Sequence, residues 1–296
     1  MSDPGNDNII DLRESPEDHV VLSVRDLTKH FPVRQGLLQR VATNAVALDR
    51  VSFDVLRGST VAVVGESGGG KTTLGRCLAG LEKPTAGGVY LRSLRGTPGA
   101  TDDRDGEIPV HELDREATRR FHRRCQLVTQ HSATSLNPKR NVCELIGRAL
   151  EVYGTRSDRS VEDQVVSALK RVGLGDQDLF RFPSEFSTGQ LQRIAIAQAL
   201  ALHPEVLVLD EPTASVDLSA QAHVLNLLVE LQRREKLSYV LITHDLSVAL
   251  HMADDAVVLR SGQVVESGPI EAVLQHPKHP YTQQLVDADP DFTPRR

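Results

Sequence analysis

Hydrophobic positions along the chain follow two periods, and these divide it into strands and helices. Short runs rich in β-branched residues at 59–64, 205–212 and 238–243 are typical of buried parallel strands. Helical periodicity follows the first run, in TTLGRCLAGL, and occupies 219–235 between the other two. Strands that alternate with helices predict a mostly parallel sheet with helices on both faces.

The amino-terminal part shows an alternation of apolar and polar residues instead. Residues 20–27 and 46–55 alternate as antiparallel strands do, and a polar loop containing Pro32 and Gly36 is expected between them. Residues 1–19 carry six acidic side chains and one arginine, which predicts a flexible, solvated tail.

The middle of the chain is mostly helical. A helix is predicted at 111–122 and a strand at 125–130. Three helical stretches then fill 141–202, and the third is expected to begin at Ser187 as its N-cap. This pattern indicates a helical insertion before the alternation of strands and helices resumes.

Composition narrows the class of protein. The 296 residues are 40% hydrophobic, enough for a core, but the net charge of −6 and the 4% aromatic content argue against binding along nucleic acid. Cys77, Cys125 and Cys143 are widely spaced, which favours reduced thiols in a cytosolic protein over a disulfide framework or a zinc site. With no signal peptide and no apolar run near ~18 residues, the chain is expected to need another chain to hold it at a membrane.

The stretch GESGGGKTT, 65–73, fits the phosphate-binding pattern G-x-x-x-x-G-K-[ST] between a predicted strand and a predicted helix. Its glycines let successive N–H groups face an anion at a helix start. Phosphate is the expected ligand: Lys71 would reach β- and γ-phosphates, and the Thr72 hydroxyl would bind Mg²⁺. The predicted contact residues are Gly65, Glu66, Ser67, Gly68, Gly69, Gly70, Lys71, Thr72 and Thr73.

Polar residues also close three predicted strands. Asp210 and Glu211 end one strand, and we expect Asp210 to hold Mg²⁺ while Glu211 acts as general base toward water. His244 ends the next strand and could orient that water. Gln130 ends a third and could touch Mg²⁺ or the water. The alternatives are an acidic strand cap and ordinary polar residues at strand ends.

Five stretches and a sixth, diagnostic one resemble the ATP-binding subunits of ABC transporters. FSTGQLQR, 186–193, is similar to the family signature LSGGQ-x-QR. The others resemble Walker A (65–73), the Q-loop (Gln130), Walker B with its catalytic glutamate (207–211), the D-loop (SVD, 215–217) and the switch histidine (His244).

The resemblance implies an α/β fold: a P-loop NTPase core with a mostly parallel sheet, an antiparallel β subdomain and an inserted helical subdomain. It implies an ABC ATPase domain at 20–266, with the helical subdomain at about 131–190, and a carboxy-terminal extension at 267–296. Two subunits would enclose two ATP molecules, with Ser187, Gly189 and Gln190 acting on the ATP of the opposite subunit. Asp217 of the D-loop would also lie at the nucleotide, and Phe31 resembles the aromatic residue that stacks on adenine.

Two further stretches resemble the peptide and nickel importer branch: HSATSLNP, 131–138, and HPYTQQLV, 279–286. This resemblance implies an ATP hydrolase that drives transmembrane permease subunits importing oligopeptides or a related small solute, served indirectly by an extracytoplasmic solute-binding protein. It implies a peripheral location on the cytoplasmic face of the inner membrane and no nucleic-acid partner. HPYT is also compatible with a plain helix start that has proline in its first turn.

One departure from the signature bears on the chemistry. Thr188 replaces its first glycine, and a positive φ at this position would strain a β-branched residue and weaken one ATP site. This departure favours a heterodimer of ATPase subunits over a homodimer. An alternative function is an ABC ATPase in a soluble multi-enzyme or nucleic-acid-processing complex, because the same fold serves different partners.

Overall fold

A six-stranded sheet, in the order β5-β6-β7-β3-β8-β9, lies at the centre of the computed structural model. The structure describes residues 19–35, 40–92, 109–132, 134–153, 158–214, 216–289 and 292. The strands of this sheet are β3 (Thr60–Val64), β5 (Cys125–Val128), β6 (Val206–Asp210), β7 (Ser238–Ile242), β8 (Asp255–Arg260) and β9 (Gln263–Pro269). All neighbouring pairs are parallel except β8 and β9, which confirms the predicted mostly parallel sheet.

Both faces of this sheet are covered, as the alternation of strands and helices predicts. Val206 and Val208 of β6 belong to one apolar cluster together with Leu74 and Leu78 of α1 (Lys71–Leu78). The intervening Leu207 and Leu209 belong to another cluster, which contains residues of α5 (Thr188–Leu200) and α6 (Leu218–Glu235). Successive residues of a strand point to opposite faces, so one apolar run of β6 supplies two cores.

A second, antiparallel sheet has the order β2-β1-β4, with β1 (Val20–Gln35), β2 (Arg40–Leu56) and β4 (Ala86–Leu91). The polar loop predicted around Pro32 is wrong in part, because β1 continues through this residue, which pairs with Asn44. The pairing of β1 with β4 ends at Thr28 opposite Ala86. Proline lacks an N–H group, and it is tolerated where a strand has a partner on one side only.

The remaining helices are α2 (Arg115–Arg124), α3 (Val142–Tyr153), α4 (Val161–Arg171), α7 (Leu246–Met252), α8 (Ile270–Gln275) and α9 (Pro280–Asp287), with short 3-10 turns η2 (Val110–Glu112), η3 (Asp176–Asp178) and η4 (Pro183–Glu185). The single helix predicted at 111–122 is wrong, because it is divided into η2 and α2. Asp114 is the reason: its carboxylate accepts the N–H groups of Glu116 and Ala117 at 2.9 and 2.8 Å and starts α2.

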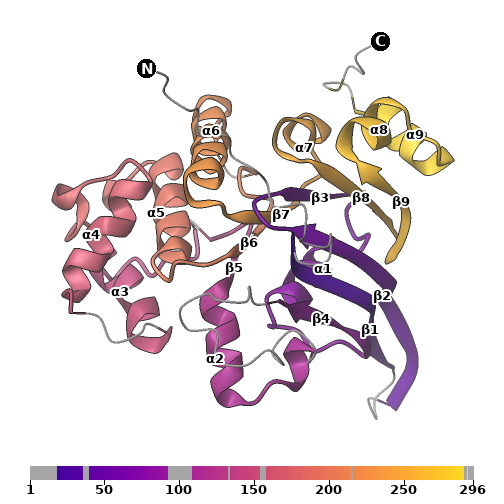
Figure 1. Ribbon diagram of the computed structural model, residues 1–296, viewed down its shortest axis with the longest axis horizontal. Helices are drawn as coiled ribbons and strands as arrows, with labels where there is room; N and C mark the ends of the chain where they lie inside the picture. Colours follow the sequence, from indigo (N-terminus) through magenta and orange to yellow (C-terminus); the bar gives the residue numbers. More distant parts are fainter. Residues whose placement is uncertain are drawn as a thin grey trace, which may run out of the picture.

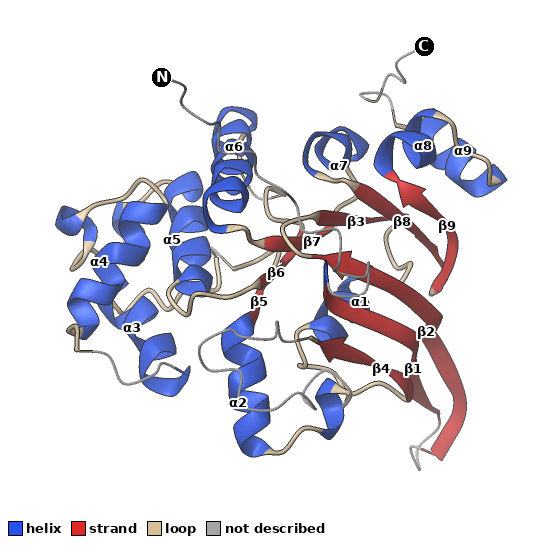
Figure 2. Cartoon of the chain, in the orientation of Figure 1, coloured by secondary structure: helices blue, strands red, loops and turns tan. Residues whose placement is uncertain are grey.

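Helices α3, α4 and the start of α5 form an arm beside the central sheet (Figures 1 and 2). Ile146, Val165 and Leu169 are fully buried between α3 and α4, so the arm has apolar packing of its own. The side chain of Ser160 caps α4 by accepting the N–H of Asp163. Among the described residues, no helix combines the length and the apolar character needed to cross a membrane.

The carboxy-terminal helices pack against the central sheet. In Figure 1, α8 and α9 lie beside β8 and β9, close to α7. Tyr281, Val286 and Phe292 are buried in one apolar cluster with Ala62 and Val64 of β3. The segment predicted as an extension therefore shares a core with the strand that leads into the glycine-rich loop. The predicted acidic tail, apart from His19, lies outside the described residues.

Candidate functional site

The glycine-rich loop runs from the end of β3 to the start of α1, and glycines decide its path. Gly65, Gly68 and Gly70 have φ values of 151°, 81° and 103°. A Cβ atom on Gly65 would lie 2.1 Å from the carbonyl oxygen of Leu259, and one on Gly70 would lie 2.4 Å from that of Ala47. No other residue type fits at these two positions, so the loop is held closely between β8 and β2.

Lys71, the first residue of α1, folds back over this loop. Its ammonium donates to the carbonyl oxygens of Gly65 and Glu66 at 2.7 and 2.9 Å, and its side chain is buried. Burial lowers the pKa of Lys71, and the nearby carboxylates, Glu211 first, oppose that shift. The loop thus holds one cation at its centre, where an anion such as a phosphate would be attracted.

Asp210 is the last residue of β6 and lies beside the start of α1. Burial raises the pKa of Asp210, and the nearby Thr72 hydroxyl opposes that shift. The Oδ1 atom is buried and has no hydrogen-bond partner among the described residues. A buried carboxylate oxygen without a partner, next to a hydroxyl, has the chemistry of an oxygen site for a hard cation such as Mg²⁺.

Glu211 follows directly and is paired with His244. Its Oε1 atom lies 2.6 Å from Nδ1 of His244 and accepts the backbone N–H of the same residue at 3.1 Å. Its backbone has φ of 52°, a left-handed conformation that is uncommon for a residue other than glycine. Its N–H donates to the carbonyl of Ile242 on β7, which continues the pairing of β6 with β7 past the strand end.

The parallel order of the sheet explains this meeting. Strands β5, β6, β7 and β3 are neighbours in that order, so their carboxyl ends share one edge. Gln130 lies two residues beyond β5 on this edge, and its side chain is exposed. Ser67 and Thr73 belong to the loop and to the first turn of α1.

Phe31 lies on the antiparallel sheet, where it pairs with Ala45, two residues before the Ala47 carbonyl that faces Gly70. Its side chain is 39% exposed, and Nζ of Lys29 lies 4.8 Å from its ring centroid. An exposed aromatic face near the glycine-rich loop is compatible with the predicted stacking on a base.

The signature residues surround the start of α5. The Ser187 hydroxyl accepts the N–H of Gln190, and the Gln190 side chain accepts the N–H of Ser187, which confirms the predicted N-cap. Gly189 is buried, and a Cβ atom there would lie 2.9 Å from Cβ of Ala220 in α6. Asp217 caps α6 by accepting the N–H of Ala220 at 2.9 Å. Ser215 lies outside the described residues.

The positive φ considered for Thr188 is wrong. Thr188 is the first residue of α5 and is not among the described residues with positive φ. Its side chain is exposed. The backbone therefore bears no strain from the replacement of glycine by threonine at this position.

A family model described as "ABC transporter" matches residues 48–214, more than half of the chain. The chain belongs to the ABC transporter family. A second model, "Oligopeptide/dipeptide transporter, C-terminal region", matches residues 265–296 of this ABC chain. As a member of the family it binds and hydrolyses ATP.

Relatives with similar sequences are ATP-binding proteins. The dipeptide transport ATP-binding protein DppF of Escherichia coli K12 is 39% identical over 95% of this ABC chain and 80% of its own length. The glutathione import ATP-binding protein GsiA of the same strain is 37% identical over 93% of this chain and 42% of its own length.

Solved structures agree with the fold. The dimeric post-hydrolysis state of the ATP-binding cassette MJ0796, bound to ADP and Pi, is 27% identical, with a TM-score of 0.68 over 84% of this chain and 98% of that one. The structure of cbiO1 from Clostridium perfringens is 25% identical, with a TM-score of 0.69 over 87% of this chain and 92% of that one.

In this ABC subunit the predicted site residues fall into two groups. The first group, at the glycine-rich loop and the neighbouring strand ends, is Lys71, Thr72, Asp210, Glu211 and His244. Ser187, Gly189, Gln190 and Asp217 gather at the starts of α5 and α6. One contact to the loop was missed. The Tyr281 hydroxyl accepts the N–H of Glu66 at 3.0 Å, although HPYT was interpreted only as a resemblance to the importer branch or as a helix start.

Proposed function

We propose that the chain is the ATP-hydrolysing subunit of an importer for dipeptides, oligopeptides or a related small solute. The observation that carries this proposal is the pair of adjoining family matches: the ABC domain is followed by the C-terminal region described for oligopeptide and dipeptide transporters. The relatives cited above are named for dipeptide transport and glutathione import. These names do not favour the alternative of a soluble multi-enzyme or nucleic-acid-processing complex.

Two such subunits would enclose each ATP. In one subunit Lys71, Thr72, Asp210, Glu211, Gln130 and His244 would face the triphosphate, and in the other Ser187 and Gly189 would complete the site. The dimeric structure of the MJ0796 cassette supports this arrangement, as does the division of the predicted site residues of this chain into two groups. The partner would be a second ABC subunit, identical or related.

Thr72 and Asp210, with Gln130, would hold Mg²⁺, and the unpartnered Oδ1 of Asp210 supports this choice. When bound, Mg²⁺ neutralises charge on the β- and γ-phosphates. The Lys71 ammonium would leave the carbonyls of Gly65 and Glu66 for the phosphates, because a charge-assisted bond to phosphate is stronger than one to a neutral carbonyl.

Glu211 would accept a proton from the attacking water through its carboxylate. The two contacts from His244 go to one oxygen, Oε1, and they fix the direction in which the carboxylate points. A base that is already held in place loses less conformational entropy when the reaction occurs, which lowers the activation barrier. His244 would thus orient Glu211 and, through its exposed side chain, face the γ-phosphate.

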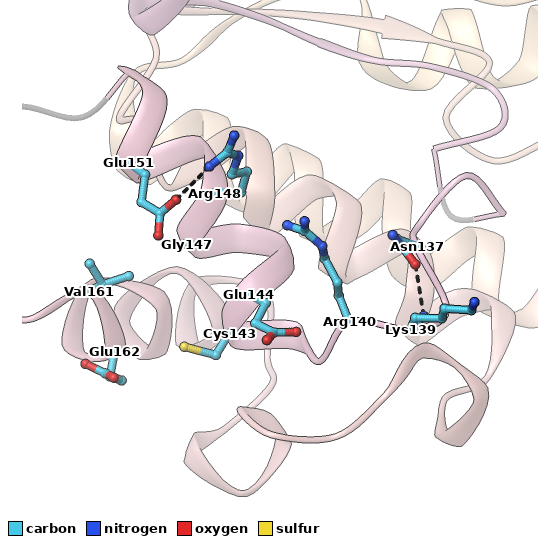
Figure 3. A pocket seen from close by; sticks show the side chains of 10 residues that line it. All are labelled: Asn137, Lys139, Arg140, Cys143, Glu144, Gly147, Arg148, Glu151, Val161 and Glu162. Atoms are coloured by element: carbon cyan, nitrogen blue, oxygen red, sulfur yellow. Dashed lines mark hydrogen bonds and ion pairs between the residues drawn. The ribbon is translucent and has the colours of Figure 1, made fainter.

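The arm of helices would dock on the permease. An open pocket of about 750 Å³ lies along α3 and the start of α4 (Figure 3). Its cationic side chains are Lys139, Arg140 and Arg148, of which Arg148 pairs with Glu151 at 3.1 Å. Lys139, Arg140 and Glu144 line this pocket, so a cytoplasmic permease segment with both charge signs would fit. This docking would hold the subunit at the cytoplasmic face of the inner membrane.

The proposal is tested by co-purification from native membranes in mild detergent, with the partners identified by mass spectrometry. We expect two polytopic membrane proteins, with or without a second ATPase and a solute-binding protein. Arg140→Glu should lose the permease but keep ATP affinity, while Arg233→Glu, an exposed change on α6, should keep both. Recovery of soluble enzymes or nucleic acid instead of a permease would contradict the importer function and leave the assignment as an ATPase unaffected.

A further inference from the structure

The phosphate loop is bonded to the carboxy-terminal segment of the same chain. The backbone N–H of Glu66, the second residue of the loop, donates to the hydroxyl oxygen of Tyr281 at 3.0 Å. Tyr281 lies in the first turn of α9, is only 2% exposed and is 215 residues away in sequence. A surface tyrosine could swing away, but this one is enclosed.

Several contacts fix the position of this hydroxyl. The N–H of Tyr281 donates to Nδ1 of His279, which caps α9, at 3.1 Å. The Glu266 carboxylate on β9 accepts the N–H groups of Lys278 and His279 at 2.9 and 3.0 Å. The guanidinium of Arg260 lies 4.7 Å from the centroid of the Tyr281 ring. These contacts hold the backbone that carries the ring, and the burial of the ring limits the movement of its hydroxyl.

The peptide groups on both sides of Glu66 are held. Its carbonyl oxygen accepts Nζ of Lys71 at 2.9 Å and the N–H of Gly69 at 3.1 Å, while its N–H goes to Tyr281. Lys71 is expected to leave this carbonyl when ATP binds. The contact to Tyr281 is made by the N–H group of Glu66 and not by its carbonyl oxygen. It does not compete with phosphate for Lys71, so it can persist through the whole cycle of ATP binding and hydrolysis.

We propose that Tyr281 is a positioning residue for the phosphate loop: its hydroxyl holds the first peptide of the loop in the conformation that binds ATP. This inference rests on the proposed role of the loop and extends it to a residue outside the ABC family match. The apolar contacts of the ring stabilise the fold and would remain with phenylalanine. The hydroxyl has a separate effect, on the affinity for nucleotide, since a preformed loop loses less conformational freedom on binding.

The test compares Tyr281→Phe with Tyr239→Phe in the full chain. Tyr239 is also buried, and its hydroxyl also makes one bond to the backbone, donating to the carbonyl of Leu228 at 2.9 Å, away from the loop. Both variants lose one tyrosine hydroxyl, so both should lower the melting temperature. Binding is measured by titration with a fluorescent ATP analogue and Mg²⁺, and steady-state hydrolysis gives KM and kcat.

We expect Tyr281→Phe to weaken ATP binding by about two- to tenfold, the effect of one net hydrogen bond, and to raise KM while kcat stays within about twofold. Tyr239→Phe should keep the wild-type Kd. A wild-type Kd in Tyr281→Phe, or an equal loss in Tyr239→Phe, overturns the inference. Lys71→Ala is measured beside them: loss of ATP binding in this variant leaves the loop assignment in place, whereas a wild-type Kd would overturn the loop assignment and this inference together.

Discussion

Nδ1 of His244 lies 2.6 Å from Oε1 of Glu211, although the two residues are separated by 33 positions. The register of the sheet produces this contact, because Asp210 of β6 pairs with Ile242 of β7 and both strands end at the same level. The segments that follow the two strands therefore begin side by side, and Glu211 and His244 meet there. The consequences of this pair and of the neighbouring carboxylate can be tested one side chain at a time.

The first prediction concerns Glu211→Gln. Glutamine keeps the shape of the side chain and can still accept the N–H of His244, but it cannot take a proton from water. We expect ATP binding to be retained, kcat to fall by about 10²–10⁴-fold, and the dimer to stay closed with ATP. Phosphate release and gel filtration with ATP measure these effects. Glu271→Gln, an exposed change on α8, is the control. Normal turnover in Glu211→Gln would show that Glu211 is not the general base.

The second prediction concerns the coupling between His244 and Glu211. His244→Ala removes the Nδ1 contact and leaves the backbone N–H bond, so the carboxylate loses one of its two orienting contacts. We expect kcat to fall by about 10–100-fold with little change in ATP affinity. Because the two side chains act as a unit, His244→Ala should cost much less in a Glu211→Gln background. Fully additive losses in this double-mutant cycle would mean that the two residues act independently.

The third prediction concerns Asp210 and pH. Burial, the largest influence, raises the pKa of Asp210 above its ordinary value of 3.8, against the opposing Thr72 hydroxyl and Lys71 charge. The folded state therefore holds a proton more tightly than the unfolded state, and stability decreases as pH rises from 3.8 through the raised pKa. Above the raised pKa, the buried charge of Asp210 lowers the free energy of unfolding by its full amount.

Asp210→Asn should remove this cost. We expect the melting temperature of the nucleotide-free chain at pH 7 to rise by about 2–4 °C, while Mg²⁺-dependent ATP binding is lost. Thermal unfolding between pH 4 and 8, with and without Mg²⁺ and ATP, measures both effects. A variant that is less stable than wild type at pH 7, or that binds Mg²⁺ and ATP normally, would contradict this account of Asp210.

The fourth prediction concerns Glu205, which joins Arg124 at 2.5 Å and Arg57 at 3.0 Å at the other end of the sheet. Burial raises its pKa, but the hydrogen bonds and charges of the two arginines outweigh it and lower the pKa below 4.5. This stabilisation is present above pH 4.5 and is lost as pH falls through the lowered pKa.

We expect Glu205→Gln to reduce the free energy of unfolding at pH 7 by about 1–3 kcal/mol and to flatten the loss of stability in acid. Glu230→Gln is the matched control: its partner Arg234 lies 3.9 Å away in an exposed pair, so the change should stay within about 0.5 kcal/mol. Urea unfolding across pH measures both variants. Equal effects of the two changes would show that the arginines do not stabilise the fold through Glu205.

Patterns within short stretches allowed the central sheet and the position of the glycine-rich loop to be predicted. β-branched runs and glycine spacing are local signals, and they identified β3, β6 and β7 and the loop after β3. Ser187 was found as an N-cap for the same reason. The cap at Asp114 carries the same kind of signal, an acidic residue before a helical run, and recognising it would have corrected the start of α2.

Features that depend on distant parts of the chain could not be predicted. Pro32 fits inside β1 because β4 pairs only with the first part of that strand, and strand length is not visible at the proline itself. Residue 189 must be glycine because Ala220 leaves no room there for a side chain. The bond from Glu66 to Tyr281 depends on where α9 packs. Which strand ends meet depends on strand order, which no local pattern contains.

One apolar cluster limits where the chain can be truncated for expression. It joins Tyr281, Val286 and Phe292 to Ala62 and Val64. A fragment that stops at Pro269 would keep every residue that faces ATP in our proposal. It would also uncover an apolar part of the cluster around β3, which α8 and α9 cover in the full chain. Such a fragment should self-associate and precipitate, so a soluble product needs a boundary beyond Phe292.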